Sequence, residues 1–253
     1  MAAEQGRSQG GVARLDGASR DELLRRYARV GRLTFWWRLR ARLKRLAWVA
    51  VVGGALAVKR LLDVVGSLLL MAALAPVFAI VALLIRLESP GPILFRQIRV
   101  GRHGRTFAMY KLRSMYVDAE QRLAVLRARN EMAGGVTFKM KDDPRITRVG
   151  RYLRKGSIDE LPQLWNVLRG DMSLVGPRPP IPAEVAEYNL SDRRRLDVIP
   201  GITCIWQVSG RSQIPFKQQV ELDVAYIESQ SLWTDLGLLL RTVPAVLLGR
   251  GAY

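Results

Sequence analysis

Residues 59–86 read KRLLDVVGSLLLMAALAPVFAIVALLIR and form the most hydrophobic segment of the chain. No charged residue lies between Asp63 and Arg86, so one helix here is long enough to cross a hydrocarbon layer of about 30 Å. Pro76, near the middle, removes a helix hydrogen bond and clashes with the preceding turn. Basic residues flank both ends, and the positive-inside rule draws both ends to the cytoplasm. We therefore expect a re-entrant membrane helix over 59–86 that is broken at Pro76.

The chain before this helix divides into two parts. Residues 1–18 are polar and contain Gly and Ser, which predicts a disordered tail. Residues 19–58 form a basic, Trp-rich extension that includes the run FWWRLRARLKR at 35–45. This composition is typical of helices that lie on anionic membrane surfaces, and a solvated basic helix is the alternative.

Two other topologies of the apolar region stay open. Residues 46–58 are also apolar, but a helix of that length reaches only about 20 Å and is too short to span a bilayer. They could pair with residues 64–85 as a helical hairpin. A kinked helix over 64–85 that spans the bilayer completely is the second alternative.

Composition restricts the chemistry. The chain has 253 residues, with 40 Lys and Arg against 22 Asp and Glu, and its net charge of +18 predicts an anionic partner such as nucleic acid, a membrane surface or a phosphorylated small molecule. A single cysteine, Cys204, excludes an intramolecular disulfide and a Cys-cluster metal site. A single histidine, His103, argues against a zinc site or a His-dependent triad. We therefore expect carboxylates, Arg and Lys to carry any reaction.

Residues 87–253 are expected to form a cytosolic catalytic domain. Two short strands, over 93–99 and 106–112, are predicted on either side of a Gly-containing turn at 101–104. Helices are predicted over 118–132, 148–155, 157–168, 183–190, 217–229 and 232–248. The expected fold is α+β and mainly helical: a re-entrant membrane helix, amphipathic interfacial helices and a small β-hairpin around the catalytic domain.

The most informative block is RKGSIDELPQLWNVLRGDMSLVGPRP, at residues 154–179. Asp159 and Glu160 are adjacent at a predicted helix start, where two carboxylates can bind a divalent cation that also holds phosphate. Arg154 and Arg178 flank them in sequence, and guanidinium groups match phosphate oxygens. A carboxylate that attacks phosphorus gives an acyl phosphate, a known form of covalent catalysis. The alternative is structural, because acids commonly stabilise helix starts and pair with arginines.

Together these segments closely resemble the bacterial sugar transferase family of monotopic phosphoglycosyl transferases. Within the family, the chain looks most like the transferases that initiate exopolysaccharide synthesis with galactose-1-phosphate or glucose-1-phosphate. The resemblance covers residues 58–253. Its ordered motifs are Lys59-Arg60-x-x-Asp63, Gln97-x-Arg99-x-Gly101-x-x-Gly104-x-x-Phe107, YKLRSM at 110–115, DDPRIT at 142–147, the 154–179 block, PGIT at 200–203, WQVSGR at 206–211, LDVAY at 222–226 and RGAY at 250–253.

The resemblance implies a two-step reaction on polyprenyl (undecaprenyl) phosphate. Asp159 would attack the β-phosphate of a UDP-sugar and release UMP, and the polyprenyl phosphate would then take the phosphosugar from the enzyme. The resemblance also implies Mg²⁺ at Asp159 and a role for Glu160 as proton acceptor or metal partner. It assigns phosphate contacts to Arg154 and Arg178, nucleotide or sugar contacts to Gln207, Gly210 and Arg211, and anchoring of the membrane helix, with cations near lipid phosphates, to Lys59, Arg60 and Asp63.

The chain departs from the family pattern in two motifs and in its N-terminal extension. The helix break is Ala75-Pro76 where the family usually has Ser-Pro, and residues 111–115 read KLRSM where the family has KFRTM. Residues before 58 lie outside the resemblance.

We expect the cytoplasmic face of the bacterial inner membrane, with a UDP-sugar, polyprenyl phosphate and an anionic bilayer as partners. A homo-oligomer is compatible with the sequence. No nucleic-acid partner is expected, because no helix-turn-helix, zinc or RNA-binding signature is present. The alternative functions are a non-catalytic basic membrane scaffold and a nucleic-acid-binding protein.

Overall fold

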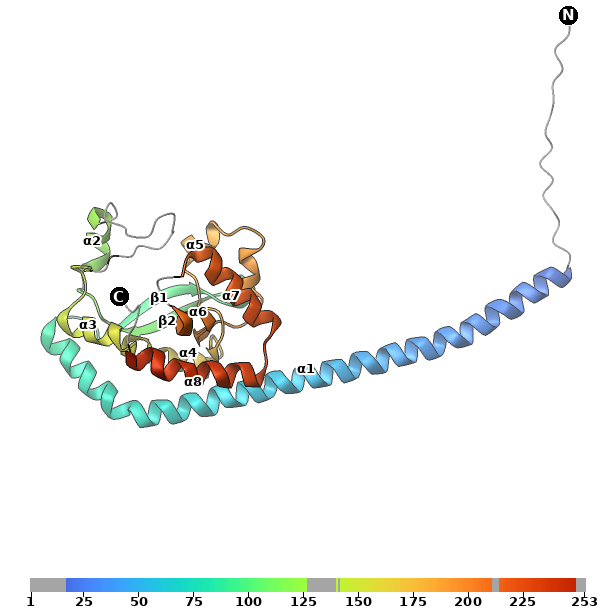
Figure 1. The fold of residues 1–253 in the computed structure, drawn as a ribbon, viewed down its shortest axis with the longest axis horizontal. Helices are drawn as coiled ribbons and strands as arrows, with labels where there is room; N and C mark the ends of the chain where they lie inside the picture. Colours follow the sequence, from blue (N-terminus) through green and yellow to red (C-terminus); the bar gives the residue numbers. More distant parts are fainter. Residues whose placement is uncertain (1–16, 127–139, 141, 211–213, 249–253) are drawn as a thin grey trace, which may run out of the picture. The chain divides into compact units, whose positions relative to one another are not determined.

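A computed structural model describes residues 17–126, 140, 142–210 and 214–248. The chain divides into two compact units, Met1–Gly54 and Ala55–Tyr253. Helix α1 (Gly17–Glu88) begins in the first unit and ends in the second (Figure 1). The remaining described elements are β1 (Leu94–Val100), η1 (Arg102–Gly104), β2 (Thr106–Leu112), α2 (Ala119–Leu126), α3 (Arg148–Lys155), η3 (Ile158–Glu160), α4 (Gln163–Arg169), β3 (Ser173–Val175), α5 (Pro182–Ala186), η4 (Asp192–Leu196), β4 (Gly201–Thr203), α6 (Ile205–Ser209), α7 (Phe216–Glu228) and α8 (Leu232–Leu248).

The expected α+β, mainly helical fold is confirmed, with a long apolar helix and two small sheets. The sequence analysis expected a break at Pro76. In the structure, α1 stays helical through this residue. Its ribbon instead bends in the C-terminal part that contains this proline, as expected for a lost hydrogen bond on one side of the helix (Figure 1). Whether this segment re-enters or spans a membrane stays a prediction.

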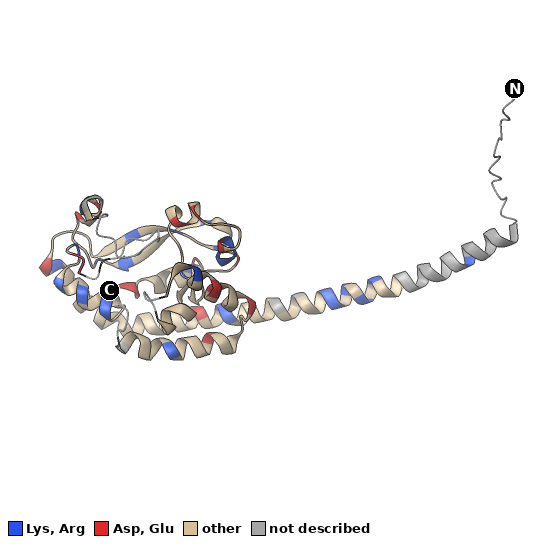
Figure 2. Ribbon diagram, turned by 45° about the horizontal axis from the view of Figure 1, so that its top comes forward, with Lys and Arg blue, Asp and Glu red and all other residues tan. Residues whose placement is uncertain are grey.

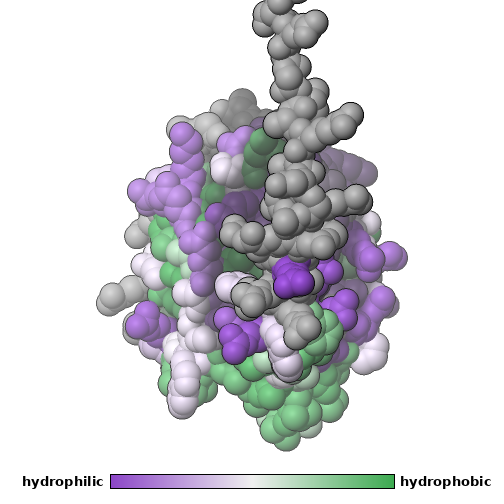
Figure 3. Space-filling view, turned by 90° about the vertical axis from the view of Figure 1, so that its right-hand side faces the viewer, coloured by the Kyte–Doolittle hydropathy of each residue, from purple (hydrophilic) through white to green (hydrophobic). Residues whose placement is uncertain are grey.

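The apolar part of α1 is exposed. The helix over Phe35–Glu88 is long and apolar enough to cross a membrane, and only 11% of its most hydrophobic window is buried. Figure 2 shows the stretch before Glu88 almost free of charged residues, and Figure 3 shows hydrophobic side chains gathered over the side of the molecule that carries α1 and α8. Such a helix supports membrane association of the chain.

Three polar side chains of α1, at positions 59, 60 and 63, attach this helix to the folded domain. Lys59 Nζ donates to the carbonyl of Val175 at 3.1 Å and pairs with Asp235 Oδ2 at 2.5 Å. Arg60 donates to the carbonyls of Val167 and Leu168 at the end of α4. Asp63 Oδ1 accepts from the backbone N–H of Leu174 at 3.0 Å. Both cations thus bond within the protein, where they satisfy backbone carbonyls, and their expected place near lipid phosphates stays a prediction.

The β-hairpin was predicted within one residue at each end. Strands β1 and β2 pair antiparallel, with Leu94 opposite Leu112 and Val100 opposite Thr106. The connection contains His103 with φ of 56° and Gly104 with φ of 78°, a left-handed pair that closes the turn.

The structure divides the helix predicted over 157–168 into two pieces. A single 3-10 turn, η3, holds Ile158–Glu160, and α4 begins only after Pro162. Pro162 lacks a backbone N–H and therefore fits a helix start better than a helix interior. The sequence analysis also missed a parallel pair of three-residue strands, β3 and β4, in which Ser173 lies opposite Gly201.

The main core lies between the hairpin and the C-terminal helices. Its buried members are Met109, Leu164, Val167, Met172, Leu174, Val175, Tyr226 and Leu238. A second buried cluster joins the end of α1 to the hairpin and α3, and consists of Val81, Ile85, Leu112 and Leu153. These two cores pack α1, β2, α3 and α4 against one another and thereby hold the residues of the 154–179 block in place.

Candidate active site

A sharp turn presents the two acidic residues. Helix α3 begins at an N-cap, where Thr147 accepts a hydrogen bond from the N–H of Gly150, and it ends at Gly156. Ser157 follows with φ of 52°, in the left-handed region that favours glycine. This conformation changes the direction of the chain after α3. Asp159 and Glu160 therefore do not continue that helix, and they line a cavity. Strain at a functional turn of this kind costs on the order of 1 kcal/mol and has to be offset by the surrounding packing.

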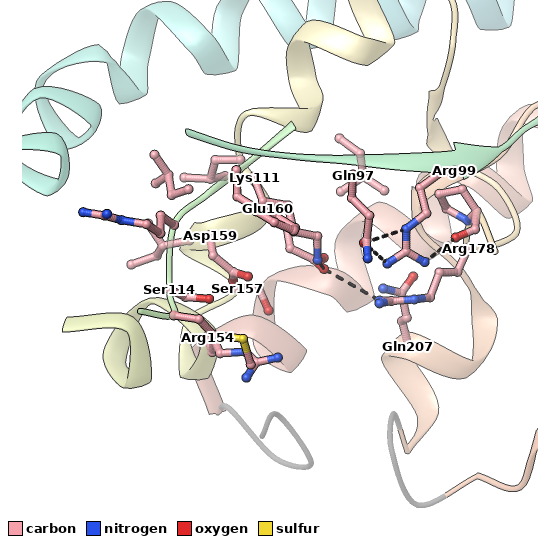
Figure 4. A pocket seen from close by; sticks show the side chains of 18 of the residues that line it. Gln97, Arg99, Lys111, Ser114, Arg154, Ser157, Asp159, Glu160, Arg178 and Gln207 are labelled. Atoms are coloured by element: carbon pink, nitrogen blue, oxygen red, sulfur yellow. Dashed lines mark hydrogen bonds and ion pairs between the residues drawn. The ribbon is translucent and has the colours of Figure 1, made fainter. Parts of the chain in front are cut away.

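The two carboxylates have different environments. Asp159 is only 7% exposed, and it makes no hydrogen bond or ion pair to another described side chain. Glu160 Oε1 accepts a hydrogen bond from Lys111 Nζ at 2.6 Å and lies 3.7 Å from Arg178 NH1. Figure 4 shows Asp159 on the side of Arg154 and Glu160 on the side of Arg178.

These environments shift the two pKa values in opposite directions. Burial raises the pKa of Asp159 to about 6; the adjacent Glu160 adds to this, and Lys111 and Arg154 oppose it. Burial alone would raise the pKa of Glu160 as well, but Lys111 and Arg178 outweigh it and hold that pKa well below its ordinary value. At neutral pH both groups are ionised, and Asp159 is the more basic and therefore the more nucleophilic carboxylate.

A second arginine holds the loop that carries Arg178. Arg99 NH1 donates to the carbonyl of Pro179 at 2.9 Å, and its Nε and NH2 both donate to Gln97 Oε1. Burial and the neighbouring charge of Arg178 lower the pKa of Arg99 to about 10, so Arg99 stays protonated at neutral pH. A buried guanidinium that bonds through all three of its nitrogens fixes the loop that carries Arg178, which lies toward Glu160 (Figure 4).

These residues line one large cavity of about 1120 Å³. Its polar part contains Gln97, Arg99, Lys111, Arg154, Asp159, Glu160, Arg178 and Gln207. The volume lies slightly above the usual range for small-molecule sites, and the four cations named in this polar part favour a polyanionic ligand.

The cavity offers few ligands for a metal ion. Among the described residues, no group of three or more His, Cys, Asp or Glu side chains is placed to hold one. Magnesium that also binds substrate phosphates needs only one or two protein carboxylates, because water and phosphate oxygens complete its shell. Asp159, which pairs with no cation in the described part of the chain, fits that requirement, whereas Glu160 already has two cationic neighbours.

The outcome differs among the three residues that were predicted to contact the nucleotide or sugar. Gln207 lines the cavity and accepts a hydrogen bond from the thiol of Cys204. Gly210 ends α6, where its N–H bonds to Trp206, and it is not among the residues that line the cavity. Arg211 lies outside the described residues.

Sequence reasoning gave no role to Lys111 and Arg99, although the structure places both in the site. Both belong to motifs that the sequence analysis quoted, at 110–115 and 97–107. The available signal was their position on adjacent strands of the hairpin, where Arg99 lies opposite Phe107 and Lys111 opposite Phe95. The sequence pattern did not predict the turn that brings Glu160 to Lys111.

The comparisons with known proteins identify the class. Residues 54–249 match the family model for bacterial sugar transferases, and the chain belongs to that family. The match begins at the boundary between the two units and includes the whole cavity.

Three relatives are 41–50% identical to the chain over about 200 aligned residues. A galactosyl transferase, CpsE, of Streptococcus agalactiae is 50% identical over 197 residues, which are 77% of this chain and 43% of that protein. An undecaprenyl-phosphate galactose phosphotransferase of Salmonella typhimurium is 41% identical over 198 residues, 77% of this chain and 41% of that protein. A UDP-glucose:undecaprenyl-phosphate glucose-1-phosphate transferase of Caulobacter vibrioides is 45% identical over 203 residues, 77% of this chain and 72% of that protein. The chain thus spans about two fifths of the length of the first two.

Proposed function

We propose that the chain transfers a hexose-1-phosphate from a UDP-sugar to polyprenyl (undecaprenyl) phosphate and releases UMP. The observation that carries the proposal is the contrast between Asp159, which is buried, has a raised pKa and forms no ion pair with a described residue, and the cations that share its cavity. The names of two relatives, which act on undecaprenyl phosphate, point to the same reaction. Galactose and glucose are the candidate sugars, because the relatives are named for these two.

In the first step, a carboxylate oxygen of Asp159 attacks the β-phosphorus of the UDP-sugar. A bond forms between that oxygen and phosphorus, the bond from phosphorus to the α-phosphate oxygen breaks, and UMP leaves with its electron pair. Arg154 and Arg178 bind the phosphate oxygens from opposite sides of the carboxylates. Magnesium held at Asp159 would offset the negative charge of the diphosphate.

In the second step, a phosphate oxygen of the polyprenyl phosphate attacks the same phosphorus. The bond to Asp159 breaks, the carboxylate is restored and polyprenyl-diphosphate-sugar leaves. A dianionic phosphate needs no base to become a nucleophile, since its second pKa is about 6. The low pKa of Glu160 makes it a weak proton acceptor. We therefore assign Glu160 a positioning role: it holds Lys111 and orients Arg178.

The lipid acceptor and the exposed apolar helix place the reaction at a membrane. Both flanks of the 59–86 segment are basic, which favours the cytoplasmic face of the bacterial inner membrane. The product would be the first lipid-linked intermediate of exopolysaccharide or glycoconjugate synthesis.

A panel of UDP-sugars tests the function directly. The purified, detergent-solubilised chain is incubated with each UDP-sugar, Mg²⁺ and undecaprenyl phosphate, and UMP release and lipid-linked sugar are measured. We expect one hexose to give both products in equal amounts, and the Asp159→Asn variant to give neither. Lipid-linked sugar formed at an unchanged rate by that variant would refute the assignment.

A further inference from the structure

The same cavity is also lined by apolar residues of α1 and α8, two helices that are joined at Lys59 and run in the same direction from there. Lys59 of α1 and Asp235 of α8 are paired at 2.5 Å, and Tyr226 donates to Asp235 and to the carbonyl of Val175, the carbonyl that Lys59 also bonds. From this junction both helices run toward their C-terminal ends along the same side of the domain (Figures 1 and 2). The junction ties the start of α8 to α1.

Beyond the junction, both helices contribute apolar side chains to the cavity wall. We name this strip the α1–α8 groove, lined by Leu70, Leu74, Leu239, Thr242, Ala245 and Val246. The hydroxyl of Thr242 is bonded to the carbonyl of Leu238 and to Thr203, so the groove carries no unsatisfied polar side chain. Leu164, Leu174 and Ile202 line the cavity as well, and Leu164 and Leu174 belong to the main core.

The cavity is therefore lined by two kinds of surface, one charged, around the two carboxylates, and one apolar, along α1 and α8. Lys111, Arg154 and Arg178 lie around the two carboxylates, while the α1–α8 groove offers only hydrocarbon. A nucleotide sugar is polar along its whole length and does not match the apolar surface. An amphiphile with an anionic head and a hydrocarbon tail matches both surfaces, because each part finds a surface of its own kind.

The outer faces of the two helices show how such a ligand would reach the groove. Next to the groove residues, Leu69 is 66% exposed and Leu240 is 65% exposed, as are further large apolar residues of both helices. Figure 3 shows this side of the molecule as its hydrophobic face. A bilayer that covers this face would lie beside the groove, so a lipid tail could enter laterally without crossing water.

We propose that the α1–α8 groove binds the first isoprenoid units of the polyprenyl phosphate acceptor and so places its phosphate beside Asp159. This proposal rests on the proposed function and adds to it the location of the lipid tail. The groove contributes to acceptor binding alone, since the lipid acceptor takes no part in the first half-reaction.

Filling the groove tests the proposal. Leu74→Trp and Val246→Trp place a large side chain in the groove, and Leu69→Trp and Leu240→Trp are matched controls on the exposed faces of the same helices. UMP release is measured as a burst without acceptor and as steady turnover with undecaprenyl phosphate. We expect the groove variants to raise the acceptor KM by about tenfold or more, with an unchanged burst, and the controls to change neither.

Each other outcome is decisive. An intact burst with an unchanged acceptor KM in both groove variants would overturn the groove assignment and leave the proposed function standing. No UMP release from the native chain with any UDP-sugar would refute the proposed function itself. A change in the molar mass of the detergent-solubilised protein, with no change in acceptor KM, would assign the groove to contact with a second copy and overturn the proposal. If a Trp variant fails to fold, Ala245→Leu fills the same groove with a smaller side chain and gives the same comparison.

Discussion

Neutralising Asp159 should stabilise the protein while it abolishes the reaction. The carboxyl is 7% exposed and forms no ion pair with any residue that the structure describes, and burial raises its pKa from 3.8 to about 6. Because the folded pKa lies above the unfolded value, the folded state favours the protonated form. Stability from this group is therefore fully present below about pH 3.8 and is lost as the pH rises through about 6.

The magnitude follows from the size of the shift. One pKa unit corresponds to 1.36 kcal/mol, so ionised Asp159 costs the folded state on the order of 3 kcal/mol at pH 8 and about half as much at pH 5. Asp159→Asn removes that cost while keeping the shape of the side chain. For a chain of this size we expect the melting temperature at pH 8 to rise by roughly 6–12 °C, and by about half of that at pH 5.

Thermal unfolding of the detergent-solubilised protein, followed by circular dichroism at the two pH values, measures this difference. The matched control is Glu160→Gln, for which we expect the opposite sign. Glu160 is stabilised as an anion by Lys111 and Arg178, and its neutralisation leaves both cations without their partner, at a cost of about 2 kcal/mol. An Asp159→Asn variant no more stable than the native chain at pH 8, or a difference that does not change with pH, would refute the electrostatic account of the site.

Three further changes should have separate effects. The rate of UMP release at low UDP-sugar concentration should rise with pH through about 6 and level off above 7, because Asp159 must be ionised to attack; a rate that stays constant down to pH 5 would contradict this. Lys111→Met should lower the rate of UMP release by at least tenfold, since it removes the 2.6 Å hydrogen bond that orients Glu160. The control is Lys155→Met, which removes an exposed cation of α3 and should leave the rate within twofold of native. Asp63→Ala should lower the melting temperature by about 3–10 °C, because the buried N–H of Leu174 loses its acceptor; an unchanged melting temperature would show that this attachment of α1 adds nothing to stability.

Local patterns predicted the elements whose signals lie within a few residues. The hairpin followed from two short strand-like segments on either side of Gly101 and Gly104, and α3 has the bounds predicted, 148–155, with Gly156 directly after its last residue. The apolar run before Arg86 was found from composition alone, and its exposure in the structure is what membrane association requires.

Elements that depend on distant contacts were missed or altered. Strands β3 and β4 have three residues each, too few for a period, and their pairing needs the close approach of Gly176 and Gly201. A Cβ on Gly201 would lie 2.0 Å from the backbone nitrogen of Gly176, so only glycine fits there, but no local signal says so. The left-handed turn at Ser157 has no glycine to announce it, and it divided the helix predicted over 157–168.

The residues of the candidate site also divide into those that local sequence predicted and those whose contacts it did not predict. Asp159, Glu160, Arg154 and Arg178 were chosen from one block of sequence, and the structure brings all four into one cavity. The partners of Lys59 and Arg60 are backbone carbonyls and the carboxylate of Asp235, all more than a hundred residues away, and no local pattern encodes them. The resemblance implied that these cations anchor the membrane helix, and the structure shows the contacts with which they hold it to the domain.

Trapping the phosphosugar on the enzyme tests the central claim most directly. The native chain and Asp159→Asn are mixed with a UDP-sugar labelled in the β-phosphate, without lipid acceptor, and are quenched in acid within milliseconds to seconds. Peptide mass spectrometry should then find a hexose phosphate on Asp159 of the native chain, formed in step with the UMP burst and lost when undecaprenyl phosphate is added. A burst of UMP with no labelled protein, or label on a residue other than Asp159, would contradict the account.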